Sequence, residues 1–258
     1  MTTHATPWNP QEILSHLSED VRQHLGSCTV VEQCCSVMDM ATPNTPGIHL
    51  CLTESQTHGR GQKGNTWHSP AQCGIWLALQ YQPSHSVRTG ILPIAMGIMI
   101  IQALKMLRAP TMLQVKWPND LYIQGKKFGG ILVETTTQGP QQRITIGIGL
   151  TLCAHPTLST LSGMTDLQSA WPNMPKRLDI LIAILATLLP GLATHIDASE
   201  LPNAFHPHDM LHGRTVTLER PQGRITGVAE GIQDQGALKI RSNDGAQHIV
   251  TDGKLIDF

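Results

Sequence analysis

The sequence contains few aromatic and few charged residues, and neither charge sign dominates. Of its 258 residues, 4% are aromatic and 14% are charged, and the formal net charge is −1. A protein that holds nucleic acid by its phosphates needs a basic surface, so this balance argues against DNA as a partner. The aromatic scarcity predicts a core built mainly from aliphatic side chains.

The cysteines form no C-x-x-C pair, and the N-terminus lacks the features of a secretion signal. It has neither a basic segment nor an apolar one. We therefore expect the six cysteines to be reduced thiols of a cytoplasmic protein. His206 and His208 lie close together without a neighbouring cysteine, which favours a surface loop over a metal site.

Apolar runs long enough to span a membrane are also missing. The two longest candidates cover residues 91–104 and 178–189, whereas a span needs roughly 20 apolar residues. Pro93 lies in the first run and Asp179 in the second. Both runs are predicted to be buried helices, and we expect no membrane partner.

Hydrophobic periodicity and turn residues predict the order of helices and strands. Helices are expected at 10–25, 90–108 and 176–189, and strands at 28–38, 48–53, 74–81 and 142–150. Residues 154–175 are expected to form a loop, and residues 202–208 a linker. From residue 211 the pattern changes to short strands at 215–219, 224–231, 237–241, 247–250 and 254–258, which predict a small β-barrel of SH3-like type.

Residues 113–134 predict two strands around a polar turn, followed by a hairpin. Apolar residues alternate at the start of this stretch, and the Gln-Gly pair at 124–125 suits a tight hairpin turn. Lys116, Asp120 and Lys127 would then lie beside an apolar sheet, where fixed cations suit a phosphate or an anionic intermediate. An ordinary hairpin with solvated charges is the alternative.

Residues 56–70 predict a flexible loop with three glycines in six residues. Backbone N–H groups of such a loop can cradle phosphate oxygens, and Arg60 and Lys63 add positive charge. The loop is not a P-loop, because Lys63 precedes Gly64 instead of standing between a glycine and a Ser or Thr. Taken alone, it is weak evidence for a nucleotide site.

These two stretches together resemble the biotin protein ligase family. K-W-P-N-D at 116–120, followed by Lys127 and by G-I-L-V-E at 130–134, is similar to the family signature. Residues 59–70 are similar to the family loop G-R-G-R-x-G-R-x-W-x-S-P, with Gln56 preceding it. The resemblance extends over about residues 10–258.

The resemblance implies an α+β fold with two domains. A mixed β-sheet with helices, the class II synthetase-like catalytic domain, would cover residues 1–210, and an SH3-like β-barrel domain would cover residues 211–258. Only about 25 residues precede the first predicted strand, which is too few for the DNA-binding domain that some members carry. The chain therefore resembles the form without that domain.

The sequence departs from the family pattern at several positions. Met40, Ala41 and Thr42 occupy the positions of an S-T-N motif that helps to hold biotin. Gln62 and Asn65 replace two loop arginines, and Thr151 replaces an Asn that contacts nucleotide. Because charge-assisted contacts are roughly twice as strong as neutral ones, these losses should weaken retention of an adenylate.

The family roles carried over to matching positions give a candidate site. The catalytic residues would be Lys127, Arg60 and Lys116. Biotin would be bound by Gln56, Arg60, Gly61, Gln62, Lys127, Gly130 and Thr42. ATP would be bound by Gly59, Lys63, Gly64, Trp67, Lys116, Asn119, Asp120 and Thr151. Asp120 would also help to hold Mg²⁺ with ATP, since Mg²⁺ favours few carboxylates together with phosphate oxygens.

The implied activity is an ATP-dependent ligase that forms biotinyl-AMP and transfers biotin to a lysine of a biotin carboxyl carrier protein. Its cofactors would be ATP and Mg²⁺, with biotin as substrate. A homodimer is also possible for a member of this family. Two alternatives stay open: a non-catalytic paralogue that binds biotin or the adenylate, and a lipoate or octanoate ligase or transferase of the same fold.

Overall fold

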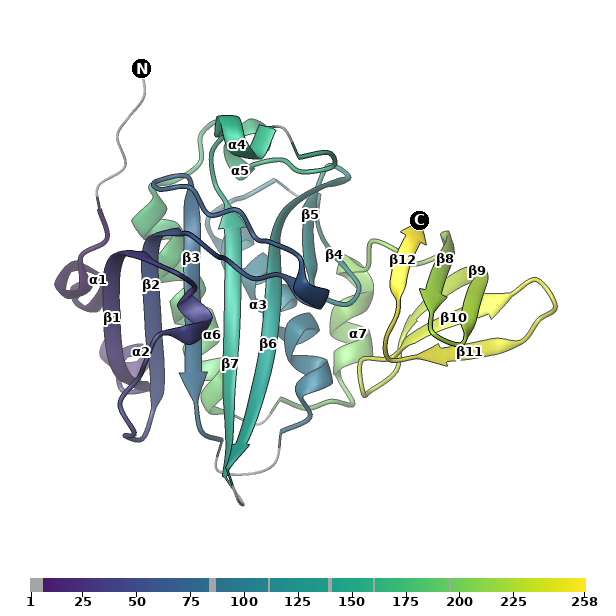
Figure 1. Cartoon of the computed structure of the whole chain (residues 1–258), viewed down its shortest axis with the longest axis horizontal. Coiled ribbons are helices and arrows are strands. Elements are labelled where there is room, and N and C mark those ends of the chain that lie inside the picture. Colours follow the sequence, from purple (N-terminus) through teal and green to yellow (C-terminus); the bar gives the residue numbers. More distant parts are fainter. Residues whose placement is uncertain (1–6, 84–86, 111, 139–140, 160, 195) are drawn as a thin grey trace.

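Two β-sheets organise the chain (Figure 1). The computed structural model describes residues 7–83, 87–110, 112–138, 141–159, 161–194 and 196–258. The larger sheet has the strand order β1-β2-β3-β7-β6-β5-β4. Its strands are β1 (Leu25–Cys34), β2 (Ile48–Gln56), β3 (Gly74–Tyr81), β4 (Leu113–Lys116), β5 (Asp120–Ile123), β6 (Lys126–Gln138) and β7 (Gln141–Thr151). Because β1 and β2 run parallel and the other neighbours antiparallel, the sheet is mixed, as predicted.

Two long apolar helices cover one face of this sheet. Figure 1 shows α3 (Leu92–Met106) and α6 (Arg177–Ala193) behind the strands. The segment 89–106 is long and apolar enough to cross a membrane by length and composition, but 67% of it is buried inside the protein. A Cβ on Gly97 would lie 3.0 Å from Val115 Cγ2, so this glycine lets α3 pack closely on β4. Helix α3 is therefore part of the core, and the prediction of a buried helix in this segment is confirmed.

The prediction of one helix over residues 10–25 is wrong. The chain forms α1 (Pro10–His16) and α2 (Glu19–Arg22), with Leu17 and Ser18 extended between them. This break turns the side chain of Leu17 into the core, where it is 5% exposed. The start of α1 is as predicted, because Asn9 Oδ1 accepts hydrogen bonds from two backbone N–H groups of the first turn.

The predicted strand at 28–38 also ends early. β1 stops at Cys34, and Val37–Asp39 form a 3₁₀ turn, η1. Ser36 Oγ accepts the Met38 N–H at 3.3 Å, and Gln56 Oε1 accepts the Val37 N–H at 2.9 Å. These side-chain contacts replace the strand ladder, because they satisfy backbone groups that a continuing β1 would have paired.

Three segments beyond β7 contain more helix than expected. The predicted loop at 154–175 contains α4 (Pro156–Ser159) and α5 (Leu167–Ala170). The predicted linker contains α7 (Leu201–Phe205) and the 3₁₀ turn η4 (His206–His208), and α6 continues through Pro190 to Ala193. Apolar side chains explain the differences, because the leucines in these short turns are buried. His208 is buried as well, so the expected surface loop at this position is wrong.

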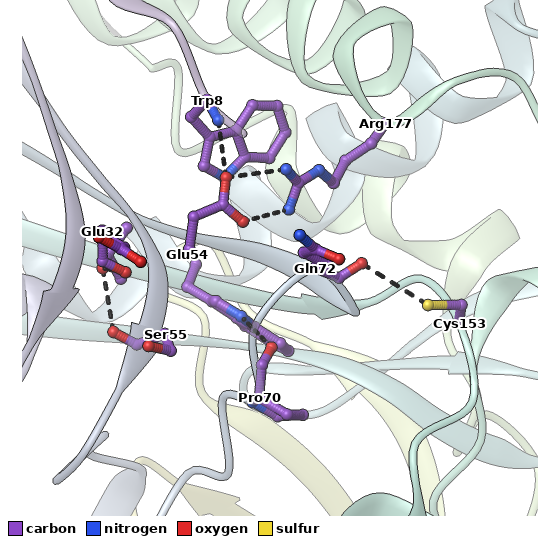
Figure 2. A network of polar contacts seen from close by, with 10 residues as sticks. Trp8, Glu32, Glu54, Ser55, Pro70, Gln72, Cys153 and Arg177 are labelled. Carbon is purple, nitrogen blue, oxygen red and sulfur yellow. Dashed lines mark hydrogen bonds and ion pairs between the residues drawn. The ribbon is translucent and has the colours of Figure 1, made fainter. Parts of the chain in front are cut away.

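A buried ion pair ties the N-terminal segment to α6 and to β2 (Figure 2). Arg177 contacts both carboxylate oxygens of Glu54, at 2.7 and 2.9 Å. Glu54 also accepts the backbone N–H of Trp8 at 2.7 Å, and the Arg177 guanidinium lies 3.8 Å from the centre of the Trp8 ring. Glu54 stands two residues before Gln56, so this network fixes the end of β2 that enters the site described below.

The smaller sheet follows the predicted strand pattern closely. It has the order β11-β10-β9-β8-β12, with β8 (Thr215–Arg220), β9 (Gly223–Ile232), β10 (Leu238–Ser242), β11 (Gln247–Val250) and β12 (Lys254–Asp257). All its pairs are antiparallel. Trp117 Nε1 donates to the Gly236 carbonyl at 2.8 Å and so joins the two sheets. Closure into an SH3-like barrel and a domain boundary at 210/211 stay predictions.

Candidate functional site

A cleft of about 350 Å³ lies between the glycine-rich loop, strands β5 to β7 and the start of β12. Most of the predicted site residues line it: Gln56, Arg60, Gly61, Gln62, Lys63, Trp67, Lys116, Asn119, Asp120, Lys127 and Gly130. The lining does not include Thr42, Gly59, Gly64 or Thr151. The fold thus gathers two segments that are separated by β3 and α3 in the sequence.

The two turns that connect β4, β5 and β6 set the positions of the charged residues. Lys116 and Asp120 pair across β4 and β5, and Asp120 faces Gly130 across β5 and β6. Lys127 Nζ lies 2.6 Å from Asp120 Oδ1, and Lys116 Nζ lies 3.8 Å from Oδ2. One carboxylate therefore stands between two ammonium groups. The turn at Gln124 and Gly125 has positive φ at both residues, as a tight hairpin requires.

The loop after α4 fixes the backbone of Lys127. The Lys127 N–H donates to the Gly163 carbonyl at 2.9 Å, and the Lys127 carbonyl accepts the Thr165 N–H at 2.8 Å. The same loop supplies Leu161 and Met164 to the cleft wall. This loop therefore holds the backbone of a candidate catalytic lysine in place and adds apolar side chains to the cleft wall.

Lys116 lies in a partly dry environment. Its Nζ is 4.1 Å from the centre of the Phe258 ring and 3.4 Å from the Tyr122 hydroxyl. Burial lowers the pKa of Lys116, and the positive charge of Lys127 lowers it further, whereas Asp120 opposes the shift. The ring of the C-terminal Phe258 therefore shields an ammonium group that lines the cleft.

Trp67 lies against two glycines of the sheet. A Cβ on Gly149 would lie 2.4 Å from Trp67 Nε1, and a Cβ on Gly130 would lie 3.4 Å from the ring. Lys127 Nζ is 5.2 Å from the centre of the ring. The buried Trp67 Nε1 has no hydrogen-bond partner among the described residues. A side chain at position 149 would displace the ring, so the indole position requires glycine there.

Charged residues of the glycine-rich loop are held by carboxylates from three different elements. Arg60 contacts Asp39 of η1 at 2.9 Å and Glu134 of β6 at 3.0 Å, and 39% of its side chain is exposed. Lys63 has φ 55° and contacts Asp252 at 3.0 Å. These contacts anchor the loop to η1, to β6 and to the turn before β12.

The side chains of Gln56 and Asn119 form hydrogen bonds within the protein. Gln56 accepts the Val37 N–H and donates to Ser69 Oγ at 2.6 Å, so both ends of its amide are engaged. Asn119 Nδ2 donates to the Ile131 carbonyl at 2.8 Å, and the Ile131 N–H returns a bond to the Asn119 carbonyl. Both residues shape the cleft wall, and direct contact with a substrate stays a prediction for each.

Four predicted residues lie outside the cleft lining. Thr42 donates to Gln80 Oε1 of β3 at 3.0 Å and accepts from Arg143 of β7 at 3.0 Å. Thr151 is 2% exposed, and its hydroxyl has no partner among the described residues. Gly59 supports the loop, because a Cβ there would lie 2.3 Å from the Trp67 carbonyl oxygen, and Gly64 has open space around it. Their substrate roles stay predictions.

The sequence predictions missed an apolar wall and one cation. The wall is formed by Val37, Met38, Leu132, Leu158, Leu161 and Met164. The cation is Lys254, which reaches the cleft from the smaller sheet. Leu132 lies inside the G-I-L-V-E stretch but received no role there, and no local motif marks the other positions, which packing brings to the cleft. Across the described part of the chain, no group of three or more His, Cys, Asp or Glu side chains is arranged to hold a metal ion.

Comparison with known proteins gives two family matches. The model of the biotin/lipoate A/B protein ligase family matches residues 30–151, and the model of the biotin protein ligase C-terminal domain matches residues 211–254. The bifunctional ligase/repressor BirA of Escherichia coli is 31% identical over 200 residues, which cover 75% of this chain and 61% of BirA. The chain thus spans about three fifths of the length of that relative.

A shorter relative and a solved structure match over most of their lengths. The biotin–[acetyl-CoA-carboxylase] ligase of Paracoccus denitrificans is 26% identical over 80% of this chain and 90% of the relative. The biotin protein ligase from Aquifex aeolicus, solved in complex with biotin and ATP, superposes with a TM-score of 0.76. It is 22% identical, and the match covers 89% of this chain and 97% of that structure, so the two share a fold.

Proposed function

Because this chain belongs to the biotin protein ligase family, we propose that it activates biotin with ATP as biotinyl-AMP and transfers the biotinyl group to one lysine of a biotin carboxyl carrier protein. The observation that carries the proposal is the cluster of Lys116, Asp120 and Lys127 on the floor of the cleft. The cluster lies beside two glycines and an indole ring, where a nucleotide and an acid can approach each other closely.

The first step joins two anions and therefore needs cations. A biotin carboxylate oxygen attacks the α-phosphorus of ATP, the bond to the β-phosphate oxygen breaks, and pyrophosphate leaves. Lys127 is the candidate for contact with both the carboxylate and the α-phosphate. Fixed ammonium groups in a partly dry cleft stabilise the charge that develops on the phosphoryl oxygens. Lys116 adds a second positive charge from the other side of Asp120.

Arg60 is the third candidate catalytic cation. Its guanidinium is engaged by Asp39 and Glu134. In this role it would exchange one of these carboxylates for the biotin carboxylate or the adenylate. Such an exchange keeps Arg60 paired throughout, so its cost is far smaller than that of burying a bare charge.

The second step consumes the mixed anhydride. The uncharged ε-amine of a carrier lysine attacks the biotinyl carbonyl carbon, AMP leaves with the bonding electrons, and the amine gives up a proton. Positioning of the two reactants supplies much of the rate, because the anhydride is already activated. The apolar wall with Met38 and Leu132 would pack against the acyl chain and exclude water that would hydrolyse the intermediate.

Asp120 also fits a supporting role for Mg²⁺. Oδ1 is taken by Lys127, whereas Oδ2 has only the more distant Lys116 ammonium at 3.8 Å. One free carboxylate oxygen suits Mg²⁺, which in nucleotide sites takes most of its ligands from phosphates and water. Bound there with ATP, the ion would neutralise part of the phosphate charge.

A mass measurement tests the proposal. The purified protein, biotin, MgATP and a biotin carrier domain should yield a carrier that gains the mass of one biotinyl group on a single lysine. Lys127→Ala should abolish formation of biotinyl-AMP, and Lys126→Ala is the matched control, because the exposed Lys126 does not line the cleft. Transfer that persists in Lys127→Ala would contradict the role given to this lysine.

One observation favours a second candidate function, a binding protein without ligase activity. Thr42, at the end of the altered S-T-N segment, directs its hydroxyl to Gln80 and not into the cleft. Calorimetry separates the two candidates. Binding of biotin without release of pyrophosphate on addition of MgATP would support the binding protein, whereas pyrophosphate release would support the ligase. Replacement of biotin by lipoate or octanoate in the same assay tests the remaining alternative.

A further inference from the structure

The turn before β12 in the smaller sheet and the start of that strand form part of the cleft. Gly253, Lys254 and Leu255 line it, opposite the glycine-rich loop. Lys63 of that loop contacts Asp252 at 3.0 Å and donates to the Gly253 carbonyl at 2.7 Å. The turn and the loop are therefore held together by contacts between residues about 190 positions apart in the sequence.

The first residue of β12 is a cation that lacks a counter-ion among the described residues. Among the lysines of the cleft, Lys116 and Lys127 share Asp120, and Lys63 has Asp252. Within the described residues, Lys254 forms no ion pair. The residue opposite it in the sheet, Glu219, is instead paired with Arg224 at 3.0 Å. Lys254 is thus the cleft lysine whose charge is available to a ligand.

We propose that Lys254 binds the polyphosphate of ATP, and that Asp252 positions Lys63 for the same purpose. The inference rests on the proposed function, since it assigns the nucleotide to this cleft. A lysine is a suitable phosphate ligand because its ammonium is a compact point charge with three donors. The smaller sheet therefore supplies a substrate ligand as well as structural support.

The polar composition of the loop explains why a cation from the second sheet is useful. Gln62 and Asn65 line the same cleft and carry no charge. The resemblance to the ligase loop implies arginine at these two positions. A positive charge on the facing wall restores part of the attraction for phosphate without changing the loop, because Coulomb attraction depends on distance and not on the element that carries the charge.

Direct binding of α,β-methylene-ATP, an ATP analogue whose bridge between the α- and β-phosphates cannot be cleaved, tests the inference. Lys254→Gln should weaken binding about tenfold, or about 1.4 kcal/mol, while the affinity for biotin stays unchanged. The matched control is Lys239→Gln, because Lys239 lies on β10 of the same sheet and does not line the cleft. Since Lys254 is exposed, the variant should melt at the wild-type temperature.

A rescue experiment separates a phosphate contact from a structural effect. Asn65→Arg should restore a large part of the lost affinity in Lys254→Gln, because it returns a positive charge to the cleft from the facing loop. Asp252→Asn should also weaken binding of the analogue, since it frees Lys63 from its partner. Absence of rescue together with a lowered melting temperature would overturn the assignment of Lys254 as a ligand.

The two proposals fail in different ways. If wild-type protein transfers biotin and Lys254→Gln binds the analogue equally well, the inference is wrong and the ligase stands. If wild-type protein binds the analogue, Lys254→Gln weakens that binding, and no biotinyl-AMP forms, the assignment of Lys254 stands and the ligase is wrong.

Discussion

Breaking the buried ion pair of Figure 2 should destabilise the protein strongly. Arg177→Met leaves the Glu54 carboxylate buried, with the Trp8 N–H as its remaining partner in that network. The side chains of Arg177 and Glu54 are only 9% and 8% exposed, so water cannot replace the lost guanidinium. Removing one partner of a buried pair costs about 3–5 kcal/mol. At about 2–4 °C per kcal/mol for a chain of this size, the melting temperature should fall by roughly 6–20 °C.

The comparison with two further variants makes this prediction specific. Glu54→Gln in the Arg177→Met background should raise the melting temperature again, because a neutral amide can still accept the Trp8 N–H while the buried charge is gone. Arg22→Met breaks the exposed pair with Glu19 and should cost at most about 1 kcal/mol. Thermal unfolding followed by circular dichroism measures all three. A loss of under about 1 kcal/mol in Arg177→Met would refute the argument, since the pair would then behave like an exposed one.

Three further predictions concern the cleft. Gly149→Ala should lower adenylate formation at least about tenfold, because the new methyl group occupies the place of the Trp67 ring; unchanged pyrophosphate release would contradict this. Gln62→Arg should slow the escape of biotinyl-AMP, seen as less labelling of bystander proteins, and equal labelling would refute it. Since burial lowers the pKa of Lys116, ATP binding should weaken with rising pH earlier than for an exposed lysine. Lys116→Arg should remove this loss of ATP binding at high pH, because arginine stays charged.

Local signals predicted the strands and the hairpin well. β3 and β11 have the predicted bounds, and the turn at 124–125 has the positive φ values that a two-residue hairpin needs. In these segments the side-chain period and the turn chemistry point to the same structure, and neighbouring strands confirm it by pairing. The helix at 10–25 failed because helical spacing of its leucines is also met by two short helices, and burial of Leu17 decides between them.

Some site residues are gathered by local turns, whereas others meet only through contacts between distant segments. Lys116, Asp120 and Lys127 lie within one short stretch, so the turns between β4 and β6 suffice to gather them. The partners of Arg60 and Lys63 come from η1, from β6 and from the smaller sheet, and no periodicity of the sequence reveals such contacts. Sequence reasoning therefore found Asp120 and most cations of the cleft, but neither Lys254 nor the carboxylates that hold Arg60 and Lys63.

These carboxylates explain how the protein keeps so many cations in a partly dry cleft before a nucleotide enters. An unpaired buried ammonium would be expensive, and it would lose its proton instead. For Lys116 and Lys127, Asp120 supplies the missing negative charge, and the phosphates of ATP can then take the place of this carboxylate. Binding at these lysines is consequently an exchange of ion pairs with a small net gain. Lys254, exposed and without a carboxylate partner within the described residues, has no pair to give up, so its attraction for phosphate adds to affinity directly.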